Sequence, residues 1–174
     1  QELVDAYETI DGEPVLDLDQ PYKDADHLEP NYDKNNLTYR ENNPYANRDP
    51  RFYASVYYNG VRRYLDSRTE TVDTYVGGNC GISDDVTDIR YTRTGYYLRK
   101  FNNYRSGNEI AGDGFIRIFR LAELYLNFAE AAYQAKVPDV LVKSTVGGSS
   151  MTARAAVNVI RSRAGMPELP RGLS

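Results

Sequence analysis

The chain has 174 residues, which fits one ordinary domain or a large part of a bigger protein, and its net charge of −4 argues against a nucleic-acid partner, which requires a basic surface. A single cysteine excludes an internal disulfide framework, and no apolar run is long enough for a transmembrane helix. Val, Leu, Ile and Phe supply only 38 residues, whereas Tyr supplies 16, so we expect a loop-rich fold with amphipathic rings near its surface.

The first predicted element is a long polar loop at residues 22–47, in which no hydrophobic period is found. It is rich in Asn and Tyr, and 14 of the 16 tyrosines of the chain precede Phe115. Long ordered loops of this kind carry function more often than short connectors do. The loop is therefore the first place to look for a site.

Two strands are predicted next. Residues 51–59 alternate, with Phe52, Ala54, Val56 and Tyr58 on one side, and Asn59-Gly60 ends the pattern. Residues 96–101 form the second candidate strand.

Two helices are predicted after Phe115. The first spans residues 120–136, where apolar residues follow helical spacing, and Pro138 ends it. The second spans about 151–164, with Ser150 or Thr152 as its N-cap and Gly165 as its C′ residue. Its stripe of small side chains predicts close antiparallel packing against the first helix, and residues 138–149 are expected to form a flexible connection.

Five segments in order resemble motifs of the SusD/RagB family of nutrient-binding lipoproteins. Residues 118–131 (IFRLAELYLNFAEA) resemble its R-L-A-E-x-Y-L-N-x-A-E-A helix, and residues 157–167 (VNVIRSRAGMP) resemble its N-x-I-R-x-R-A-G-M-P helix end. The other three segments are 2–12, 47–53 (NRDPRFY) and 94–101 (TGYYLRKF). Together they cover nearly the whole chain.

The resemblance implies a mainly α fold built on a helical, TPR-like scaffold. Residues 1–114 would form a loop-rich lobe with a few short β-strands, and residues 115–174 an antiparallel helix pair, the two making one structural unit. The family's N-terminal helical repeats, its lipidated cysteine and its later C-terminal segment have no counterpart in this sequence. We therefore expect the chain to be an internal part of a longer protein.

The function implied by the resemblance is non-catalytic binding of an oligosaccharide at the outer-membrane surface. The expected partner is a SusC-like TonB-dependent transporter, membrane association would depend on a lipid anchor outside this chain, and no cofactor is implied. A peptide ligand remains an alternative within the family. Alternatives from other classes are a glycan-active hydrolase and a helical-repeat protein-interaction module.

The candidate ligand contacts lie in the loop. Sugars stack their C–H faces on aromatic rings and bond their hydroxyls to amides, so interleaved Tyr and Asn supply both kinds of contact. The alternative is that most of these rings pack the loop on the core. The candidates are Tyr22, Tyr32, Asn35, Asn36, Tyr39 and Tyr45.

Structural roles are favoured for the charged motif residues. Arg48, Asp49 and Arg51 surround Pro50 and are interpreted as a clamp rather than a ligand-binding turn, because arginine can bind carboxylates and carbonyls in pairs. Three further polar residues share one face of the first helix. The helix rise separates the two carboxylates among them by about 10 Å, so pairing with arginines is favoured over catalysis. These are Glu123, Asn127 and Glu130, and the arginines at the second helix end are Arg161 and Arg163.

No metal site or nucleophile is predicted. The acidic residues from Asp17 onward fail the EF-hand spacing, because Tyr22 stands where Gly is required and Leu28 where Glu is required. His27 is the only histidine, and Cys80 lacks a histidine partner in its vicinity in the sequence.

Overall fold

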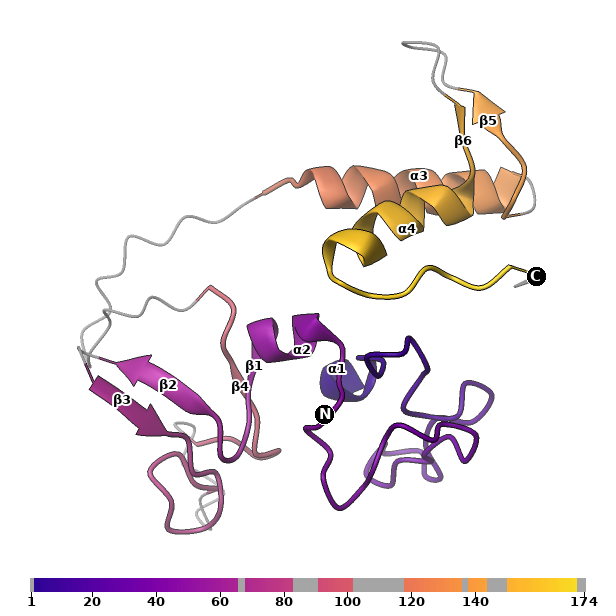
Figure 1. The fold of residues 1–174 in the computed structure, drawn as a ribbon. Helices are drawn as coiled ribbons and strands as arrows, with labels where there is room; N and C mark the ends of the chain where they lie inside the picture. Colours follow the sequence, from indigo (N-terminus) through magenta and orange to yellow (C-terminus); the bar gives the residue numbers. More distant parts are fainter. Residues whose placement is uncertain are drawn as a thin grey trace. The chain divides into compact units, whose positions relative to one another are not determined.

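The computed structural model describes residues 2–65, 68–82, 91–101, 118–135, 138–143 and 150–171. Their contacts divide the chain into two compact units (Figure 1). The loop-rich unit comprises Gln1–Thr9 and Glu13–Phe115, and the helical unit comprises Ile10–Gly12 and Ile116–Ser174.

Within its described residues, the loop-rich unit contains two short helices and two small antiparallel sheets. Strands β1 and β4 pair with Val56 opposite Leu98, and β2 and β3 form a hairpin with Arg62 opposite Thr71. Residues 6–49 hold no helix or strand and make only isolated bridges, such as Leu16 with Tyr32. The elements are α1 (Glu2–Asp5), α2 (Pro50–Ser55), β1 (Val56–Tyr57), β2 (Arg62–Leu65), β3 (Arg68–Thr71) and β4 (Tyr97–Leu98).

The predicted strand at residues 51–59 is wrong over its first half, which is helix α2. Asp49 caps this helix, because its side chain accepts the backbone N–H of Arg51, and Pro50 occupies the first turn, where its fixed φ suits a helix. Phe52 and Val56 also fit the i, i+4 spacing of a helix, and both are buried in one cluster. Only Val56–Tyr57 is extended and paired.

The predicted strand at residues 96–101 is confirmed only at its centre. Strand β4 covers Tyr97–Leu98, and the backbone N–H groups of Arg99 and Lys100 both bond to Ser55 O. Phe101 has a φ of 72°, which lies outside the extended region and ends the strand.

Both helices predicted in the C-terminal part are confirmed, as α3 (Leu121–Ala135) and α4 (Ala153–Arg163). Helix α4 begins two residues later than predicted, because Met151 belongs to a strand and Thr152 Oγ1 accepts the N–H of Ala155 as the N-cap. At its end Gly165 has a φ of 75°, and Met166 N–H donates to Arg161 O at 2.9 Å. This is a Schellman cap, which only a residue tolerant of positive φ completes without strain.

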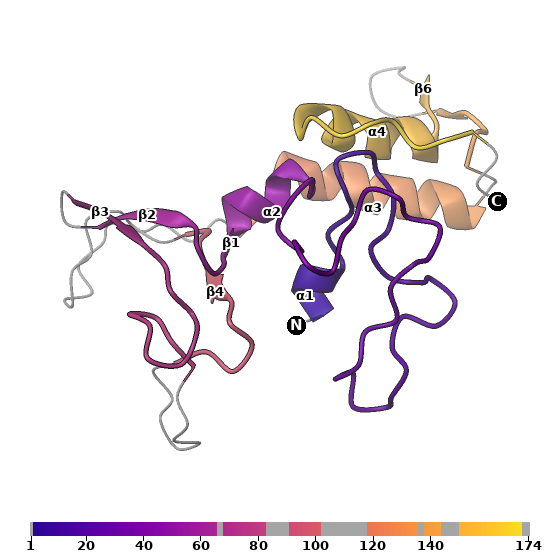
Figure 2. The same cartoon turned by 60° about the horizontal axis from the view of Figure 1, so that its bottom comes forward.

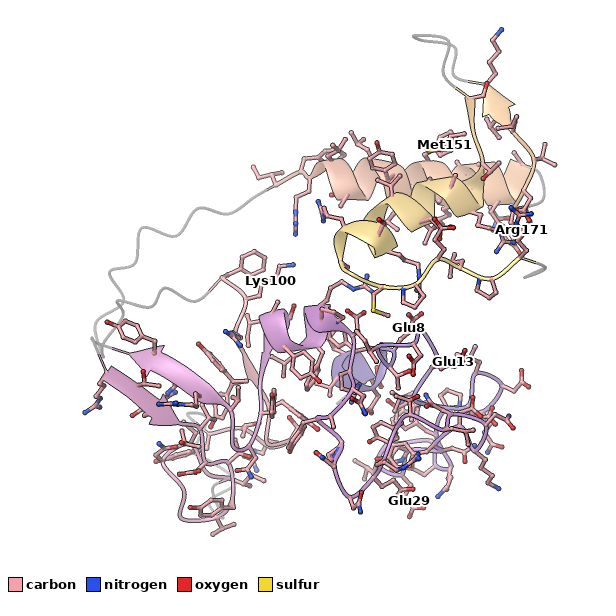
Figure 3. All side chains as sticks on the ribbon, in the orientation of Figure 1. Glu8, Glu13, Glu29, Lys100, Met151 and Arg171 are labelled. Atoms are coloured by element: carbon pink, nitrogen blue, oxygen red, sulfur yellow. The ribbon has the colours of Figure 1, made fainter. Side chains whose placement is uncertain are left out.

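Helices α3 and α4 run antiparallel and side by side in both Figure 1 and Figure 2. Their contact is built from small residues, which allow the backbones to approach closely. Met151, labelled in Figure 3, packs against this contact. The buried centre consists of Ala129, Ala132, Ala153 and Ala156.

The connection predicted to be flexible carries paired strands at its two ends. Strand β5 (Val142–Lys143) pairs with β6 (Ser150–Met151), with Val142 opposite Met151. Residues 144–149 lie outside the described part of the chain. The expectation of a mainly α chain with a few short strands is met in part, because the described helices hold 36 residues and the strands are short, but irregular segments predominate around them.

Candidate functional site

Arg48 is buried in the loop-rich unit and binds three of its backbone carbonyls. Its side chain is only 3% exposed. Nη2 donates to Val4 O at 2.7 Å and to Tyr7 O at 3.0 Å, and Nη1 donates to Pro44 O at 3.0 Å. Burial lowers the pKa of the guanidinium, but arginine stays protonated in proteins. The charge is therefore solvated by backbone carbonyls, and one side chain joins α1 to the end of the long loop.

Asp49 and Arg51 complete this turn. Asp49 is fully buried, and both its carboxylate oxygens accept hydrogen bonds from the Arg51 guanidinium. The Asp49 carboxylate raises the pKa of Arg51, and the Asp49 N–H donates to Glu8 O at 2.9 Å. This is the geometry expected of a structural clamp, and it leaves the Asp49 carboxylate inaccessible to a ligand.

An aromatic cluster packs around the fully buried Phe52. The Tyr58 ring stacks on Phe52 with centroids 5.3 Å apart, and Tyr45 lies 4.5 Å from Tyr58. The Tyr53 hydroxyl donates to Tyr45 O at 2.7 Å and accepts the Arg48 N–H at 3.1 Å. Tyr45, predicted as a ligand contact, is therefore a partly buried member of this aromatic cluster and does not line the loop pocket described below.

A pocket of about 620 Å³ lies on the segment between residues 23 and 42, a size typical of small-molecule sites. We call it the loop pocket. Figure 3 shows how densely side chains line this part of the chain, near the labelled Glu29. The lining of the loop pocket combines aromatic rings, amides and charges of both signs: Lys23, Asn31, Tyr32, Asp33, Lys34, Asn36, Tyr39, Arg40, Glu41 and Asn42.

The aromatic wall of the loop pocket is a pair of tyrosines. The rings of Tyr32 and Tyr39 lie 5.1 Å apart at an interplanar angle of 32°. Tyr39 is buried, and burial together with a hydrogen bond to Tyr32 raises its pKa. The Tyr39 hydroxyl is therefore protonated at physiological pH, and Tyr32, which is half-buried, is the ring with free surface.

Asn36 has a structural task that its sequence position did not reveal. Its side chain is 7% exposed, with Nδ2 donating to Pro14 O at 2.7 Å. Its Oδ1 accepts the N–H groups of Thr38 and Tyr39 at 3.0 and 2.9 Å. These bonds hold the turn that presents Tyr39, so Asn36 shapes the pocket wall rather than offering free polar atoms.

Tyr22 lies outside the loop pocket, in a second group of contacts. Its hydroxyl donates to Asp5 Oδ2 at 3.0 Å, and burial with this bond raises its pKa to about 12. The His27 ring stacks on it at 4.4 Å and 8°, and His27 Nδ1 lies 2.5 Å from Glu2 Oε1. These contacts attach the loop to α1.

Of the six predicted ligand residues, the structure brings Tyr32, Asn36 and Tyr39 to one pocket. Asn35 is exposed beside it, with its N–H bonded to Asp33 Oδ1. Asn31 and Asn42, two of the amides interleaved with the tyrosines in the sequence, also line it. Sequence reasoning missed the five charged lining residues, although all of them lie within the predicted loop: Lys23, Asp33, Lys34, Arg40 and Glu41.

The motif residues of the helical unit have different surroundings. Glu123, Asn127 and Glu130 are exposed on α3, and none of the ion pairs among the described residues joins them to an arginine. Arg161 is buried and its Nε donates to Pro167 O at 2.7 Å, whereas Arg163 is exposed. The pairing of the α3 carboxylates with arginines, expected from the sequence, is thus not found in this part of the chain.

The acidic residues near His27 serve local turns. The Asp24 carboxylate accepts the N–H groups of Leu28 and Glu29, which lower its pKa, and Asp17 Oδ1 accepts those of Asp19 and Gln20. The described residues contain no group of three or more His, Cys, Asp or Glu side chains placed to hold a metal ion.

Two further observations complete the survey. Cys80 is buried, and burial raises the pKa of its thiol, which disfavours the reactive thiolate. Among the helices of the described segments, none has the length and apolar character required to cross a membrane.

The fold is thus that of a loop-rich protein with an antiparallel helix pair and a polar, aromatic-lined pocket. A sequence profile of the SusD family matches residues 1–172, and the chain belongs to this family. The resemblance inferred from five motifs is thereby confirmed. A search of curated proteins finds no match.

Two solved structures share the fold. A SusD-like protein from Bacteroides fragilis is 29% identical with a TM-score of 0.58, over 98% of this chain and 29% of that chain. A SusD-like carbohydrate binding protein from the same species is 19% identical with a TM-score of 0.51, over 98% of this chain and 28% of that chain, and this likeness shows the fold alone. The chain therefore spans less than a third of the length of these relatives.

Proposed function

We propose that the protein binds an oligosaccharide without catalysis, as a surface-exposed component of an outer-membrane nutrient uptake system. Membership of the SusD family supports this proposal, and one structure with the same fold is described as a carbohydrate binding protein. A TonB-dependent, SusC-like transporter is the proposed partner, with attachment to the membrane through a lipid anchor.

The loop pocket is the observation that carries the proposal. A sugar requires an apolar surface for its C–H face and fixed polar groups for its hydroxyls. Tyr32 supplies a half-buried ring held against Tyr39, and Asn31 and Asn42 supply amides on the same lining. The other predicted contacts, Tyr22 and Tyr45, do not line the loop pocket, because Tyr22 bonds to Asp5 and Tyr45 packs in the Phe52 cluster, so Tyr32 is the proposed stacking platform.

Isothermal titration calorimetry with a panel of oligosaccharides tests binding by the full-length protein. Replacing Tyr32→Ala should weaken binding about two- to thirteenfold, since an aromatic contact contributes roughly 0.5–1.5 kcal/mol beyond area burial. Tyr75→Ala is the matched control, because Tyr75 is 59% exposed and does not line the pocket. Equal affinities for the wild type and Tyr32→Ala would overturn the assignment of the site.

Two further measurements separate the alternatives. Binding of peptides but not of oligosaccharides would favour a peptide-binding member of the family. Release of reducing ends during incubation with a bound glycan would contradict the non-catalytic role. Co-purification with a SusC-like barrel transporter tests the proposed partner independently of the ligand.

A further inference from the structure

The charges around the loop pocket differ from those of the whole chain. The chain carries a net charge of −4, whereas the pocket lining holds three cations and two carboxylates. The cations are Lys23, Lys34 and Arg40, all exposed, and the carboxylates are Asp33 and Glu41. An acidic protein has thus gathered an excess of positive charge at one polar pocket.

The three cations are not used to hold the fold. None of the ion pairs within the described segments involves Lys23 or Lys34. Arg40 donates one N–H, from Nη1 to the carbonyl of the preceding Tyr39 at 2.8 Å. That bond fixes the direction of the guanidinium and leaves its remaining donors for a ligand.

The carboxylates offset this charge only in part. Asp33 Oδ1 accepts the N–H of Asn35 at 2.8 Å, and the Asp33 carbonyl accepts that of Asn36 at 3.2 Å. Asp33 is therefore occupied in the turn that builds the pocket wall. Glu41 is the other carboxylate of the lining, and its side chain accepts no backbone N–H in the hydrogen bonds found among the described residues.

Neutral sugars need rings and amides, which Tyr32, Asn31 and Asn42 already provide. Three cations that take part in no ion pair among the described residues match an anion instead, because lysine attracts it as a point charge and arginine can bind a carboxylate or sulfate through two parallel bonds. Resting on the proposed function, we infer that the loop pocket takes an oligosaccharide bearing an acidic group, held by Lys23, Lys34 and Arg40.

The test compares ligands that differ only in charge. Full-length protein is titrated with uronic-acid oligosaccharides of several backbones, with their carboxyl-reduced neutral counterparts, and with sulfated oligosaccharides of equal length. The acidic ligands should bind at least about tenfold tighter at 0.05 M salt, and most of this advantage should disappear at 1 M salt, where the Debye length falls to roughly 3 Å. The uronic and sulfated arms distinguish the two sources of the anion.

Variants assign the effect to the pocket. Lys34→Gln and Arg40→Gln should each weaken binding of the acidic ligand roughly three- to tenfold, since these are exposed, charge-assisted contacts, and should weaken binding of the neutral counterpart by a smaller factor. Lys143→Gln removes an equal charge from β5 of the helical unit and should change neither affinity.

The outcomes separate this inference from the proposed function. If neutral oligosaccharides bind as tightly as acidic ones, and Tyr32→Ala still weakens them, the inference is overturned and the proposed function stands. If no oligosaccharide of either kind binds, both are overturned. Unchanged acidic affinity in Lys34→Gln and Arg40→Gln would also overturn the inference.

Discussion

The guanidinium carbon of Arg48 lies 4.9 Å from the centre of the Phe52 ring, and the two residues are 3% and 0% exposed. A desolvated cation over an aromatic face gains more than an exposed one does. Because the same guanidinium also binds carbonyls of Val4, Tyr7 and Pro44, it joins the aromatic cluster to the loop. This relationship explains how a long polar segment holds a defined pocket with little aliphatic core.

Replacing Arg48→Met should destabilise the loop-rich unit strongly. The substitution removes the Arg48 donors from Tyr7 O and Pro44 O and leaves Val4 O only the longer bond from Tyr7 N–H. Because each buried group that loses its partner costs about 1–3 kcal/mol, a loss of roughly 3–5 kcal/mol is expected. Urea unfolding followed by tyrosine fluorescence measures it. Arg40→Met, at an exposed position, is the control and should change stability by less than about 0.5 kcal/mol. A similar small loss in both variants would contradict the clamp.

Substitution of Asp49 should separate helix capping from the ion pair. Asp49→Ala removes the acceptor for the Arg51 N–H and should cost about 1–2 kcal/mol or more, as the loss of an N-cap does. Asp49→Asn keeps that acceptor but loses the charge facing the Arg51 guanidinium, so it should fall between Ala and the wild type. Hydrogen exchange of the Val56 N–H, which bonds to Phe52 O, reports on the helix itself. Equal protection in all three proteins would refute the capping role.

The close approach of α3 and α4 predicts a sharp size limit at Ala156. This residue is 0% exposed in the alanine cluster, so Ala156→Leu should overpack the contact and cost about 1–3 kcal/mol. Ala155→Leu adds the same atoms at the neighbouring exposed position and is expected to be nearly neutral. Thermal unfolding of both variants measures the difference. If Ala155→Leu is the more damaging variant, the described packing is wrong.

The ion pair between Arg154 and Asp139 predicts a pH dependence in the helical unit. Arg154 Nε and Nη2 bind the two Asp139 carboxylate oxygens at 2.6 and 3.0 Å, and these bonds lower the Asp139 pKa below its ordinary value of 3.8. Because the Asp139 pKa is lower in the folded state than in the unfolded state, the ion pair stabilises the fold fully above the unfolded-state pKa. This stabilisation is lost as the pH falls through the folded-state pKa.

Asp139→Asn should therefore be less stable than the wild type at pH 7, and the difference should shrink as pH falls below 3.8. Thermal unfolding at a series of pH values measures this convergence. Glu168→Gln removes an exposed carboxylate after α4 and serves as the control. A constant difference between Asp139→Asn and the wild type at all pH values would show that the charge of Asp139 is not responsible.

The sequence by itself determined the helix pair and the family. Thr152, Gly165 and the alanine stripe act through contacts within a few residues of one another, so their spacing predicts α4 and its ends closely. The motifs that indicate the SusD family are likewise contiguous. Local capping also explains the main error, because Asp49 and Pro50 begin a helix where the alternation of Phe52 to Tyr58 predicted a strand.

Only the tertiary structure decided which polar loop residues share a pocket. Lys23, Lys34 and Arg40 line one pocket in a loop that long-range contacts hold in place. The side chain of Asn36 bonds to Pro14, 22 residues earlier, and that of Arg48 bonds to Val4, 44 residues earlier. A loop without hydrophobic period carries no sequence signal for such pairings. In the folded loop, Tyr45 packs in the Phe52 cluster whereas Tyr32 lines the pocket. The sequence of a single polar segment does not distinguish these two tyrosines.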